Sequence, residues 1–285
     1  MTEVDTALYV VATPVGNLSD LTERARAVLG AVEVVYAEDT RRTARLLEDV
    51  GARPELRSLH EHNEASRVDE ILERLRDGDA CALVSDAGTP GVSDPGRRTV
   101  AAVLDGGWRV VPVPGPSAVT AALSASGLPG DRFTMMGFPP RSGRERDAWM
   151  ERVSSSPTTV VVFESPRRTG ELLAAWEERG LGGRVCVLCR ELTKMHEEVR
   201  RGTVAELRAA TADRELKGEV TLVLAGAEPS GEADRPSEVE AAARSLLQHG
   251  WSTRDVTRHL GEVFGVPRNE AYELALELEA EEGSD

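Results

Sequence analysis

The chain is poor in cysteine and almost free of lysine. Its three cysteines are Cys81, Cys186 and Cys189, and an odd number without a framework spacing argues for a reducing compartment rather than a set of disulfides. Cys186 and Cys189 form a CxxC inside an apolar run, where strand geometry would point them to opposite faces as buried thiols. Of the 34 basic side chains, only Lys194 and Lys217 are lysines. This is typical of a coding bias toward arginine, in which two surviving lysines can mark places that need an ammonium group.

Targeting and membrane signals are also lacking. The N-terminus carries Glu3 and Asp5 and has no apolar core of a secretory signal. The one long uncharged stretch, residues 110–130, is interrupted by prolines and glycine, so it predicts a strand, a loop and a helix rather than a membrane span. We therefore expect a cytoplasmic protein.

Positive charge is scarce overall, since the net charge of the 285 residues is −15. Such a balance is unfavourable for binding a nucleic acid. Residues 226–285, however, hold 14 acidic residues and five arginines, a net charge of −9, whereas the first 225 residues carry only −6. The acidic surplus is thus concentrated in the tail, and the body of the chain is nearly balanced.

What is present is a regular alternation of apolar runs and amphipathic stretches. This βαβα rhythm predicts a mostly parallel sheet with helices on both faces. The expected strands lie at 8–12, 32–37, 80–85 and 109–113, and the expected helices at 21–29, 40–50, 64–76, 96–104 and from 117. A second series begins near residue 133, with strands at 158–163, 184–189, near 199 and at 219–225, and helices at 144–153, 166–179 and 204–210.

The tail is predicted to be helical. A polar stretch at 228–236 reads as a linker, and helices are expected at 237–249, 253–264 and 268–279. The predicted fold class is therefore α/β with parallel-rich sheets and a small C-terminal helical region. The expected domains are residues 1–137, with the Gly/Pro-rich loops, residues 138–227, a second α/β domain, and residues 237–282, which resemble a helix-turn-helix.

Three loops rich in glycine and proline follow predicted strands. The first loop is residues 12–18 (ATPVGNL), the second is 85–96 (SDAGTPGVSDPG) and the third is 113–118 (VPGPSA). Ligands of open α/β sheets bind beyond the carboxyl ends of the strands, glycine lets the backbone approach them, and proline fixes the loop shape. One such loop could be an ordinary turn, but three in one domain favour a small-molecule site.

The loops lack the sequences that bind nucleotide phosphates. Neither GxxxxGK[ST] nor GxGxxG occurs in the chain, which argues against a di- or triphosphate ligand. The carboxylates of Asp86 and Asp94 suit a cationic or hydroxyl-rich ligand better, and S-adenosylmethionine carries a sulfonium, an ammonium and ribose hydroxyls. Spacing alone predicts no more than a small-molecule site in an α/β enzyme.

Longer motifs carry a family resemblance. The runs TPVGNLSDLTERA (13–25) and AEDTRRTARLL (37–47), with the second and third loops, resemble the tetrapyrrole methylase superfamily, and within it the branch that methylates small-subunit ribosomal RNA. The second half agrees through GFPPR (137–141), FESPRR (163–168), RELTK (190–194) and KGE (217–219). Two departures stand out: the first loop lacks the GxGPG pattern of many members, and residues 139–141 are Pro-Pro-Arg where Leu-Pro-x-Lys is common.

The resemblance implies an enzyme that uses S-adenosylmethionine to methylate the ribose 2′-hydroxyl of a cytidine in 16S ribosomal RNA. It also implies a homodimer with the cofactor in the cleft between two α/β domains, and no metal is expected. The residues expected at the cofactor are Thr13, Pro14, Gly16, Asn17, Asp86, Ala87, Gly88, Thr89, Val92, Ser93, Ser117, Ala118, Phe163 and Ala225.

Two further groups of residues are expected at the chemistry. A base that removes the hydroxyl proton would add roughly 10²–10⁴-fold to the rate, and the candidates are Asp39, Glu191 and Lys194. Lys194 would need a desolvated site to lose its proton, or it could hold a phosphate instead. The arginines expected at the RNA are Arg41, Arg42, Arg45, Arg141, Arg144 and Arg167, although several have acidic neighbours in sequence and could be solvated surface charges.

Two other functions fit parts of the sequence. The same scaffold could methylate a carbon of a tetrapyrrole, but nothing in the AEDTRRT segment favours it. Residues 253–278 could make the chain a DNA-binding regulator, with Gly265 at the turn of a helix-turn-helix. The acidic tail is a poor match for a phosphate backbone, which favours a packing or dimer role for it.

Overall fold

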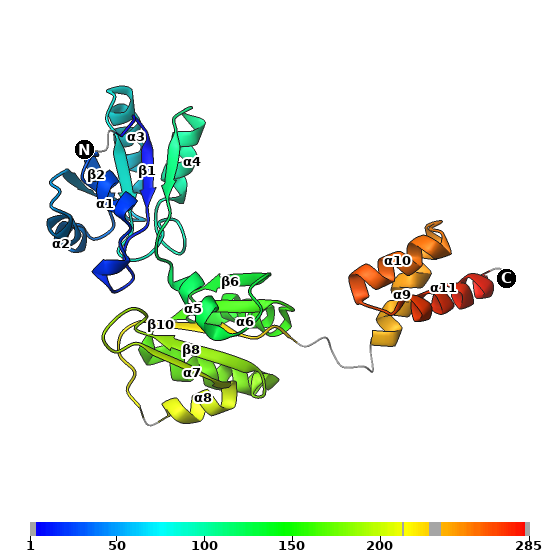
Figure 1. The fold of residues 1–285 in the computed structure, drawn as a ribbon. Helices are drawn as coiled ribbons and strands as arrows, with labels where there is room; N and C mark the ends of the chain where they lie inside the picture. Colours follow the sequence, from blue (N-terminus) through cyan, green and yellow to red (C-terminus); the bar gives the residue numbers. More distant parts are fainter. Residues whose placement is uncertain (1–3, 213, 228–234, 283–285) are drawn as a thin grey trace. The chain divides into compact units, whose positions relative to one another are not determined.

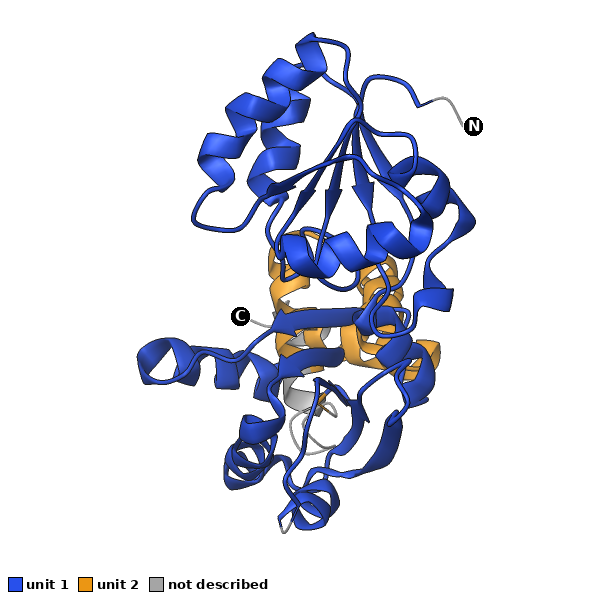
Figure 2. Ribbon diagram, turned by 90° about the vertical axis from the view of Figure 1, so that its left-hand side faces the viewer, with its two compact units in different colours: residues 1–226 blue, residues 227–285 orange. Residues whose placement is uncertain are grey.

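A computed structural model of the protein describes residues 4–212, 214–227 and 235–282. The chain forms two compact units, Met1–Gly226 (unit 1) and Ala227–Asp285 (unit 2), which Figure 2 shows in blue and orange. Within the described ranges, no helix is both long and apolar enough to cross a membrane.

Unit 1 begins with a five-stranded sheet in the order β3-β2-β4-β1-β5, in which every pair of neighbours is parallel. The strands are β1 (Leu8–Val11), β2 (Val34–Ala37), β3 (Glu55–Ser58), β4 (Cys81–Val84) and β5 (Val110–Val113). The helices between them are α1 (Glu23–Leu29), α2 (Thr40–Val50), α3 (Glu64–Arg76) and α4 (Arg97–Asp105), and a short 3-10 helix, η1 (Leu18–Asp20), precedes α1.

Alternating strand residues bury the two faces of this sheet under different helices. Val35, Ala82 and Val84 pack with Val28 of α1 and Leu47 of α2. The intervening strand residues, Tyr36 and Leu83 among them, pack instead with α3 and α4. The strands are therefore apolar on successive residues because both of their faces are covered, as in other parallel sheets.

The second sheet of unit 1 has the order β6-β7-β10-β8-β9, and Figure 1 labels three of its strands, β6, β8 and β10. Its strands are β6 (Phe133–Gly137), β7 (Thr159–Glu164), β8 (Val185–Arg190), β9 (Glu198–Thr203) and β10 (Val220–Leu224). Only β6 and β7 pair in parallel, and the other three pairs are antiparallel. Five of the eight strand pairings described in unit 1 are thus parallel, and the predicted α/β fold is confirmed.

Helices also cover both faces of the second sheet. The helices α6 (Gly143–Ser155), α7 (Pro166–Trp176) and α8 (Val204–Thr211) share one core that contains Trp176 and Cys186. The other face packs against α5 (Ala118–Ser126) and includes Cys189. The two cysteines of the CxxC therefore face opposite sides of the sheet as predicted, and burial raises the pKa of both thiols.

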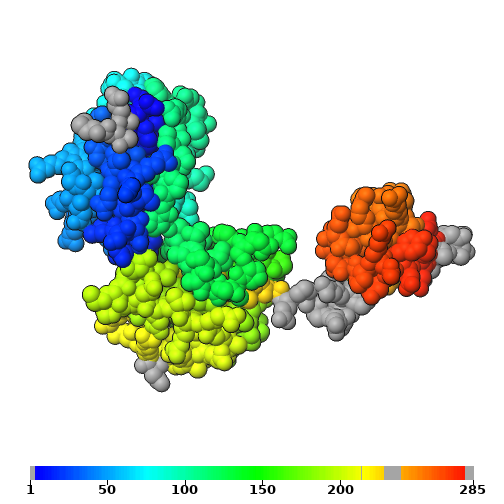
Figure 3. Space-filling model, viewed as in Figure 1, coloured from blue at the N-terminus to red at the C-terminus, as the bar shows by residue number. Residues whose placement is uncertain are grey.

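The second sheet begins before residue 137, where the sequence predicted the boundary between the two α/β domains. β6 pairs with β7, so the second sheet already starts at residue 133. Helix α5 also belongs to this half, because Val119 and Ala122 pack with Val161, Val187 and Val223 of the second sheet. Figure 3 shows the two halves of unit 1 in contact, with the first sheet's residues in blue to cyan and the second sheet's in green to yellow.

Most predicted helices and strands lie within a few residues of their expected places, and α2 and α3 have the predicted bounds. Two strands were missed. β3 reads ELRS, which is too polar for an apolar pattern to reveal, and β6 was expected only as the start of the second series; each lies at an edge of its sheet. The helix expected at 166–179 is α7 up to Trp176 and continues as a π-helical turn, η2 (Glu177–Leu181), in which Gly180 has a φ of +82°.

The described residues of unit 2, 227 and 235–282, form three helices, α9 (Arg235–Gln248), α10 (Thr253–Phe264) and α11 (Arg268–Glu282). They enclose a small core that includes Val256, Leu260 and Ala271. Residues 228–234 of the predicted linker lie outside the described residues. Helix α9 begins at Arg235, within the stretch predicted as linker.

Candidate functional site

The three glycine- and proline-rich loops meet at the carboxyl edge of the first sheet and are joined by hydrogen bonds. Thr13 in the first loop exchanges two backbone hydrogen bonds with Gly88 in the second, with N–O distances of 2.8 and 3.0 Å. The Thr89 hydroxyl donates to the Pro116 carbonyl of the third loop at 3.3 Å. Gly88 has a φ of +83°, a conformation that favours glycine at this junction. The loops thus form one connected platform.

A cavity of about 380 Å³, here called the central cavity, lies above this platform. Its volume falls within the range of roughly 300–1,000 Å³ that is usual for small-molecule sites. The second and third loops line one side, and the ends of β7 and β10 with the residues beside them line the other. Phe138 and Phe163 form an aromatic pair in the wall, with ring centroids 5.5 Å apart. The cavity therefore draws on both sheets of unit 1.

Carboxylates give the central cavity its chemical character. Asp86, Asp94, Glu164 and Glu219 all line it. Burial, together with the nearby charges of Glu38 and Asp86, raises the pKa of Asp94 from 3.8 to about 6. Such a shift is the usual result when a carboxylate is desolvated next to other carboxylates.

Glu164 is the most deeply buried of these acids, with a side chain that is 1% exposed. Its Oε1 accepts a hydrogen bond from the Ser165 backbone N–H at 2.7 Å. Its Oε2 lies 3.4 Å from an Arg168 guanidinium nitrogen but accepts no hydrogen bond. A buried carboxylate oxygen with unused acceptor capacity in a cavity wall is suited to a ligand that donates hydrogen bonds.

The turn between β8 and β9 reaches the first loop from the second sheet. A Cβ added to Gly16 would lie 2.3 Å from Cγ of Lys194, so the lysine stem packs directly on the loop backbone. The Lys194 ammonium donates to Glu191 at 2.8 Å and to Glu219 at 3.1 Å. Burial opposes the charge on Lys194, but these hydrogen bonds prevail and raise its pKa. Lys194 is therefore held as an ammonium.

Backbone strain gathers at the same place. Among the described residues, three non-glycine residues have a positive φ: Ser93 at 61°, Glu191 at 51° and Thr193 at 66°. Ser93 lines the central cavity, and the other two belong to the turn that reaches the first loop. Each such conformation costs on the order of 1–3 kcal/mol, and strain of this kind concentrates at functional sites.

A second cavity of about 300 Å³, here called the side cavity, adjoins the central one. It is lined by the first loop and by α2, including Arg42 and Arg45. Arg42 and Asp86 line both cavities, and their side chains form an ion pair at 3.4 Å. This pair is thus part of the wall shared by an acidic cavity and a cavity that contains two arginines.

Most residues expected at the cofactor line one of the two cavities. Nine line the central cavity: Asp86, Ala87, Gly88, Thr89, Val92, Ser93, Ser117, Ala118 and Phe163. Thr13, Pro14 and Gly16 line the side cavity. Asn17 instead caps η1, with its side chain accepting from the Ser19 N–H at 3.0 Å. Ala225 follows the far end of β10, whereas the cavity is lined by residues 218–221 at the near end.

The three base candidates lie around the cavities but do not line the central one. The Asp39 side chain caps α2, its backbone N–H donates to Asp86 at 2.8 Å, and hydrogen bonds from Arg41 lower its pKa. The hydrogen bond from Lys194 lowers the pKa of Glu191. Asp39 and Glu191 therefore bind protons more weakly than ordinary carboxyls, and Lys194 holds its proton more tightly than an ordinary lysine.

The arginines expected at RNA are only partly gathered. Arg42 and Arg45 line the side cavity together. Arg41 is turned to Asp39 in a 3.2 Å ion pair, and Arg141 and Arg144 are exposed near the start of α6. Arg167 lines a separate hollow of about 490 Å³ between α7 and α8.

The sequence reasoning missed two acids of this site, Glu164 and Glu219, and it named Asp94 as an acid suited to a cationic ligand without placing it among the expected site residues. Asp94 was visible in the second loop, but no pattern indicated its burial. Glu164 and Glu219 flank strands of the second sheet, and their arrival at the first sheet's loops depends on tertiary packing. In the described part of the chain, no group of three or more His, Cys, Asp and Glu side chains is arranged to hold a metal ion.

Known proteins with similar sequences cover nearly all of the chain. A Synechocystis sp. protein named ribosomal RNA small subunit methyltransferase I is 41% identical over 278 residues, which are 96% of this chain and 99% of the relative. A Mesorhizobium japonicum protein of the same name is 41% identical over 282 residues, 98% and 95% of the two chains.

Solved structures and family models agree on the fold. A uroporphyrin-III-C-methyltransferase from Thermus thermophilus superposes with a TM-score of 0.55 at 23% identity, covering 76% of this chain and 93% of that one. The model of the tetrapyrrole (corrin/porphyrin) methylases matches residues 7–208. With two loop-lined cavities that share Arg42 and Asp86, and with relatives 41% identical over 96–98% of its length, the chain belongs to the tetrapyrrole (corrin/porphyrin) methylase family.

Proposed function

We propose that the chain transfers a methyl group from S-adenosylmethionine to the ribose 2′-hydroxyl of a cytidine in 16S ribosomal RNA of the small subunit. The observation that carries this proposal is the acidic central cavity joined, through Arg42 and Asp86, to a side cavity that contains arginines. The relatives at 41% identity are named ribosomal RNA small subunit methyltransferase I, and that name supports the substrate class.

The central cavity fits the cofactor chemically. S-adenosylmethionine, when bound, supplies a methyl group activated by a positively charged sulfur. Asp86 and Asp94 offer negative charge to a cationic ligand, and Oε2 of Glu164, which accepts no hydrogen bond, offers an acceptor. The rings of Phe138 and Phe163 offer an apolar surface to a flat heterocycle. These residues would hold and orient the cofactor, and alignment is what in-line methyl transfer chiefly requires.

Asp94 is the best-placed proton acceptor. It lines the central cavity, and its pKa of about 6 leaves it deprotonated at pH 7 yet more basic than an ordinary aspartate. A base works best when its pKa is close to the working pH. The Asp94 carboxylate would therefore take the proton of the ribose hydroxyl, while a role for Asp39, Glu191 or Lys194 in that step stays a prediction.

The RNA would approach from the side cavity. Arg42 and Arg45 stand there with exposed side chains, and guanidinium groups pair well with phosphates. Contacts from Arg141, Arg144 and Arg167 remain part of the proposal. The tetrapyrrole alternative has less support, because the relatives at 41% identity are named for ribosomal RNA and the tetrapyrrole enzymes match at 23% identity or below.

A homodimer in the cytoplasm completes the proposal. Phe138, Met195 and Val199 expose large apolar side chains close to the site, with Met195 93% exposed, and a second copy would cover such residues. Light scattering at micromolar protein should then report about twice the chain mass of 30.7 kDa. A fully active monomer would contradict the dimer but leave the chemistry untouched.

The decisive experiment is transfer of a tritiated methyl group from the cofactor to isolated small subunits and to naked 16S RNA, followed by nucleoside mapping. The expected product is a single 2′-O-methylcytidine. Asp94→Asn should lower transfer roughly 10²–10⁴-fold, while calorimetry still detects cofactor binding through Asp86 and Glu164. Label on a base, on a tetrapyrrole added as competitor, or on no RNA at all would overturn the proposal.

A further inference from the structure

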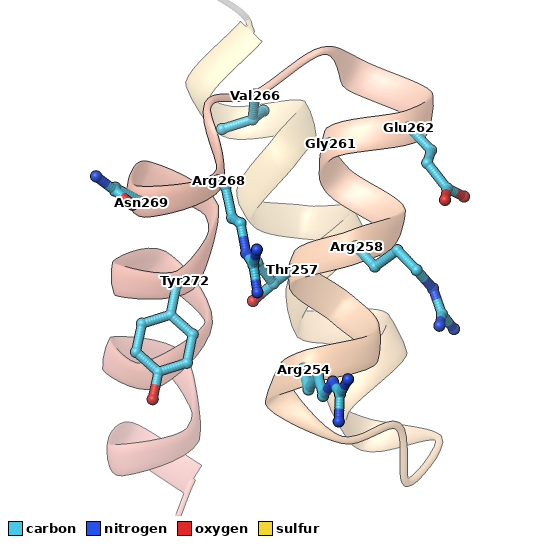
Figure 4. Close-up of a pocket in the computed structure, with 9 residues that line it drawn as sticks. All are labelled: Arg254, Thr257, Arg258, Gly261, Glu262, Val266, Arg268, Asn269 and Tyr272. Atoms are coloured by element: carbon cyan, nitrogen blue, oxygen red, sulfur yellow. The ribbon is translucent and has the colours of Figure 1, made fainter.

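Unit 2 has a wide groove on its surface that the proposed chemistry does not use. The groove measures about 910 Å³ and lies between α10 and α11 (Figure 4). A short turn joins these helices, with Gly265 at a φ of +66° closing α10. The apolar core of the unit is formed by other faces of the helices, so the groove is an outer surface.

Arginine dominates the lining of this groove. Arg254 and Arg258 lie one helical turn apart on α10, and Arg268 extends from the start of α11 toward Thr257 (Figure 4). Arg258 forms an ion pair with Asp255 at 2.9 Å. Among the described residues, Arg254 and Arg268 have no ion pair, and both are exposed. Two guanidinium groups are therefore available to an anion.

The charges of the tail are sharply segregated. Residues 227–285 contain five arginines and 14 acidic residues, yet the groove takes three of those arginines and only one acid, Glu262. A random placement would make any surface of this tail acidic. The groove is therefore a local cationic surface on an otherwise acidic body, and its charge complements a polyanion.

The remaining lining residues indicate which polyanion. Tyr272 projects from α11 with 49% of its surface exposed, and Asn269 lies one turn before it (Figure 4). An exposed aromatic ring beside arginines is the arrangement on which single-stranded nucleic acids stack their bases. A side-chain amide can donate to and accept from a base edge. An acidic peptide would use the arginines but has no need of the ring.

We infer that the groove of unit 2 binds a single-stranded segment of RNA, with phosphates on Arg254 and Arg268 and a base on Tyr272. The inference rests on the proposed function for the identity of the polyanion, because an enzyme acting on ribosomal RNA meets RNA at high local concentration. The groove would add a second contact with the substrate, on a different unit of the chain from the one that holds the methyl-transfer site. The acidic faces around it would repel RNA and confine the contact to the groove.

The test uses the full chain and fluorescence anisotropy with a labelled single-stranded oligoribonucleotide of about a dozen nucleotides across a salt series. The double variant Arg254→Glu/Arg268→Glu should weaken binding and flatten the salt slope by roughly 0.7 for each lost phosphate contact. Tyr272→Ala should weaken binding roughly 5- to 100-fold with little change in the slope. Arg244→Glu on α9 is the charge control for Arg254→Glu and Arg268→Glu made singly, because each of the three variants changes the net charge by two and only Arg244 lies outside the groove.

Three results would overturn the inference. Wild-type binding by the double variant would place the RNA elsewhere. An unchanged affinity in Tyr272→Ala, together with displacement of the RNA by polyglutamate, would identify an acidic protein as the partner instead. An equal loss of RNA affinity in Arg244→Glu would show that the effect comes from net charge and not from the groove. Methyl transfer by the wild-type chain to 16S RNA is measured in parallel, so failure of the proposed function is recognised separately from failure of the groove.

Discussion

Replacing Asp94 by asparagine should stabilise the protein and inactivate it. The folded state raises the pKa of this carboxyl from 3.8 to about 6, so it prefers the protonated form and loses stability as the proton leaves. The loss is absent well below pH 3.8, grows between the two pKa values and is complete above about pH 6. Each pH unit between the two values is worth 1.36 kcal/mol, which gives a cost of about 3 kcal/mol at pH 8.

Asparagine cannot ionise, so Asp94→Asn should recover this cost. The gain in unfolding free energy is expected to be about 3 kcal/mol at pH 8, about 1.5 kcal/mol at pH 5 and about 0.5 kcal/mol at pH 4. Urea denaturation at each pH measures it directly. Asp105→Asn, an exposed change at the end of α4 and outside both cavities, is the control for the substitution itself.

The same variant tests the proton acceptor. In the wild type, kcat/KM should rise about tenfold per pH unit below pH 6 and then level off, because it follows the base of the free enzyme. Asp94→Asn should lose this rise along with roughly 10²–10⁴-fold in rate. A pH-independent stability gain would refute the assigned burial of the carboxyl. Full activity in the variant would refute its role in catalysis.

Three other variants test the surroundings of the site. Gly16→Ala and Lys194→Ala should each lower the unfolding free energy, but their losses should not add in Gly16→Ala/Lys194→Ala, because the second change removes the clash that the first creates; additive losses would contradict the contact. Arg42→Glu should raise the KM for the ribosomal substrate and reduce the salt slope of that KM by close to one. The control, Arg76→Glu, lies at the opposite edge of the sheet and should leave the KM and its salt slope unchanged. Equal salt slopes in the two variants would show that RNA does not bind at the side cavity. Trp176→Ala should lower the unfolding free energy by about 3–5 kcal/mol in a denaturation experiment. Trp176→Phe should lower it far less, because the indole N–H that it removes is buried without a hydrogen-bond partner. A similar loss in both variants would mean that the N–H is satisfied.

The sequence predicted what depends on local pattern. Buried strands such as β4 could be predicted from continuous apolar residues, and α2 and α3 could be predicted from their amphipathic spacing. The three loops could be placed at one edge because parallel strands share their carboxyl ends. The mixed second sheet could not be derived in this way, since the pairing of β10 with β7 and β8 is decided by packing across long separations.

The residues of the candidate site could likewise be predicted only where they depend on the local sequence. Asp86 and Gly88 could be predicted from the second loop, and both line the central cavity. The ionisation of Asp94 could not, because it depends on how much solvent the second sheet removes and on the distance to Glu38. The ammonium of Lys194 was open to two roles until its carboxylate partners, Glu191 and Glu219, were brought beside it by the fold.

The central position of β10 bears on how the chain acquires its structure during synthesis. The first sheet uses residues 8–113 only, so it can form as soon as these have left the ribosome. The second sheet cannot close at that stage, because β7 and β8 are both paired with β10, which ends at residue 224. Until then two strands expose unpaired edges, a state prone to aggregation. We expect the second half of unit 1 to be the slow, chaperone-dependent step of biogenesis, and a nascent chain stopped before residue 220 to hold one folded domain and one unfinished one.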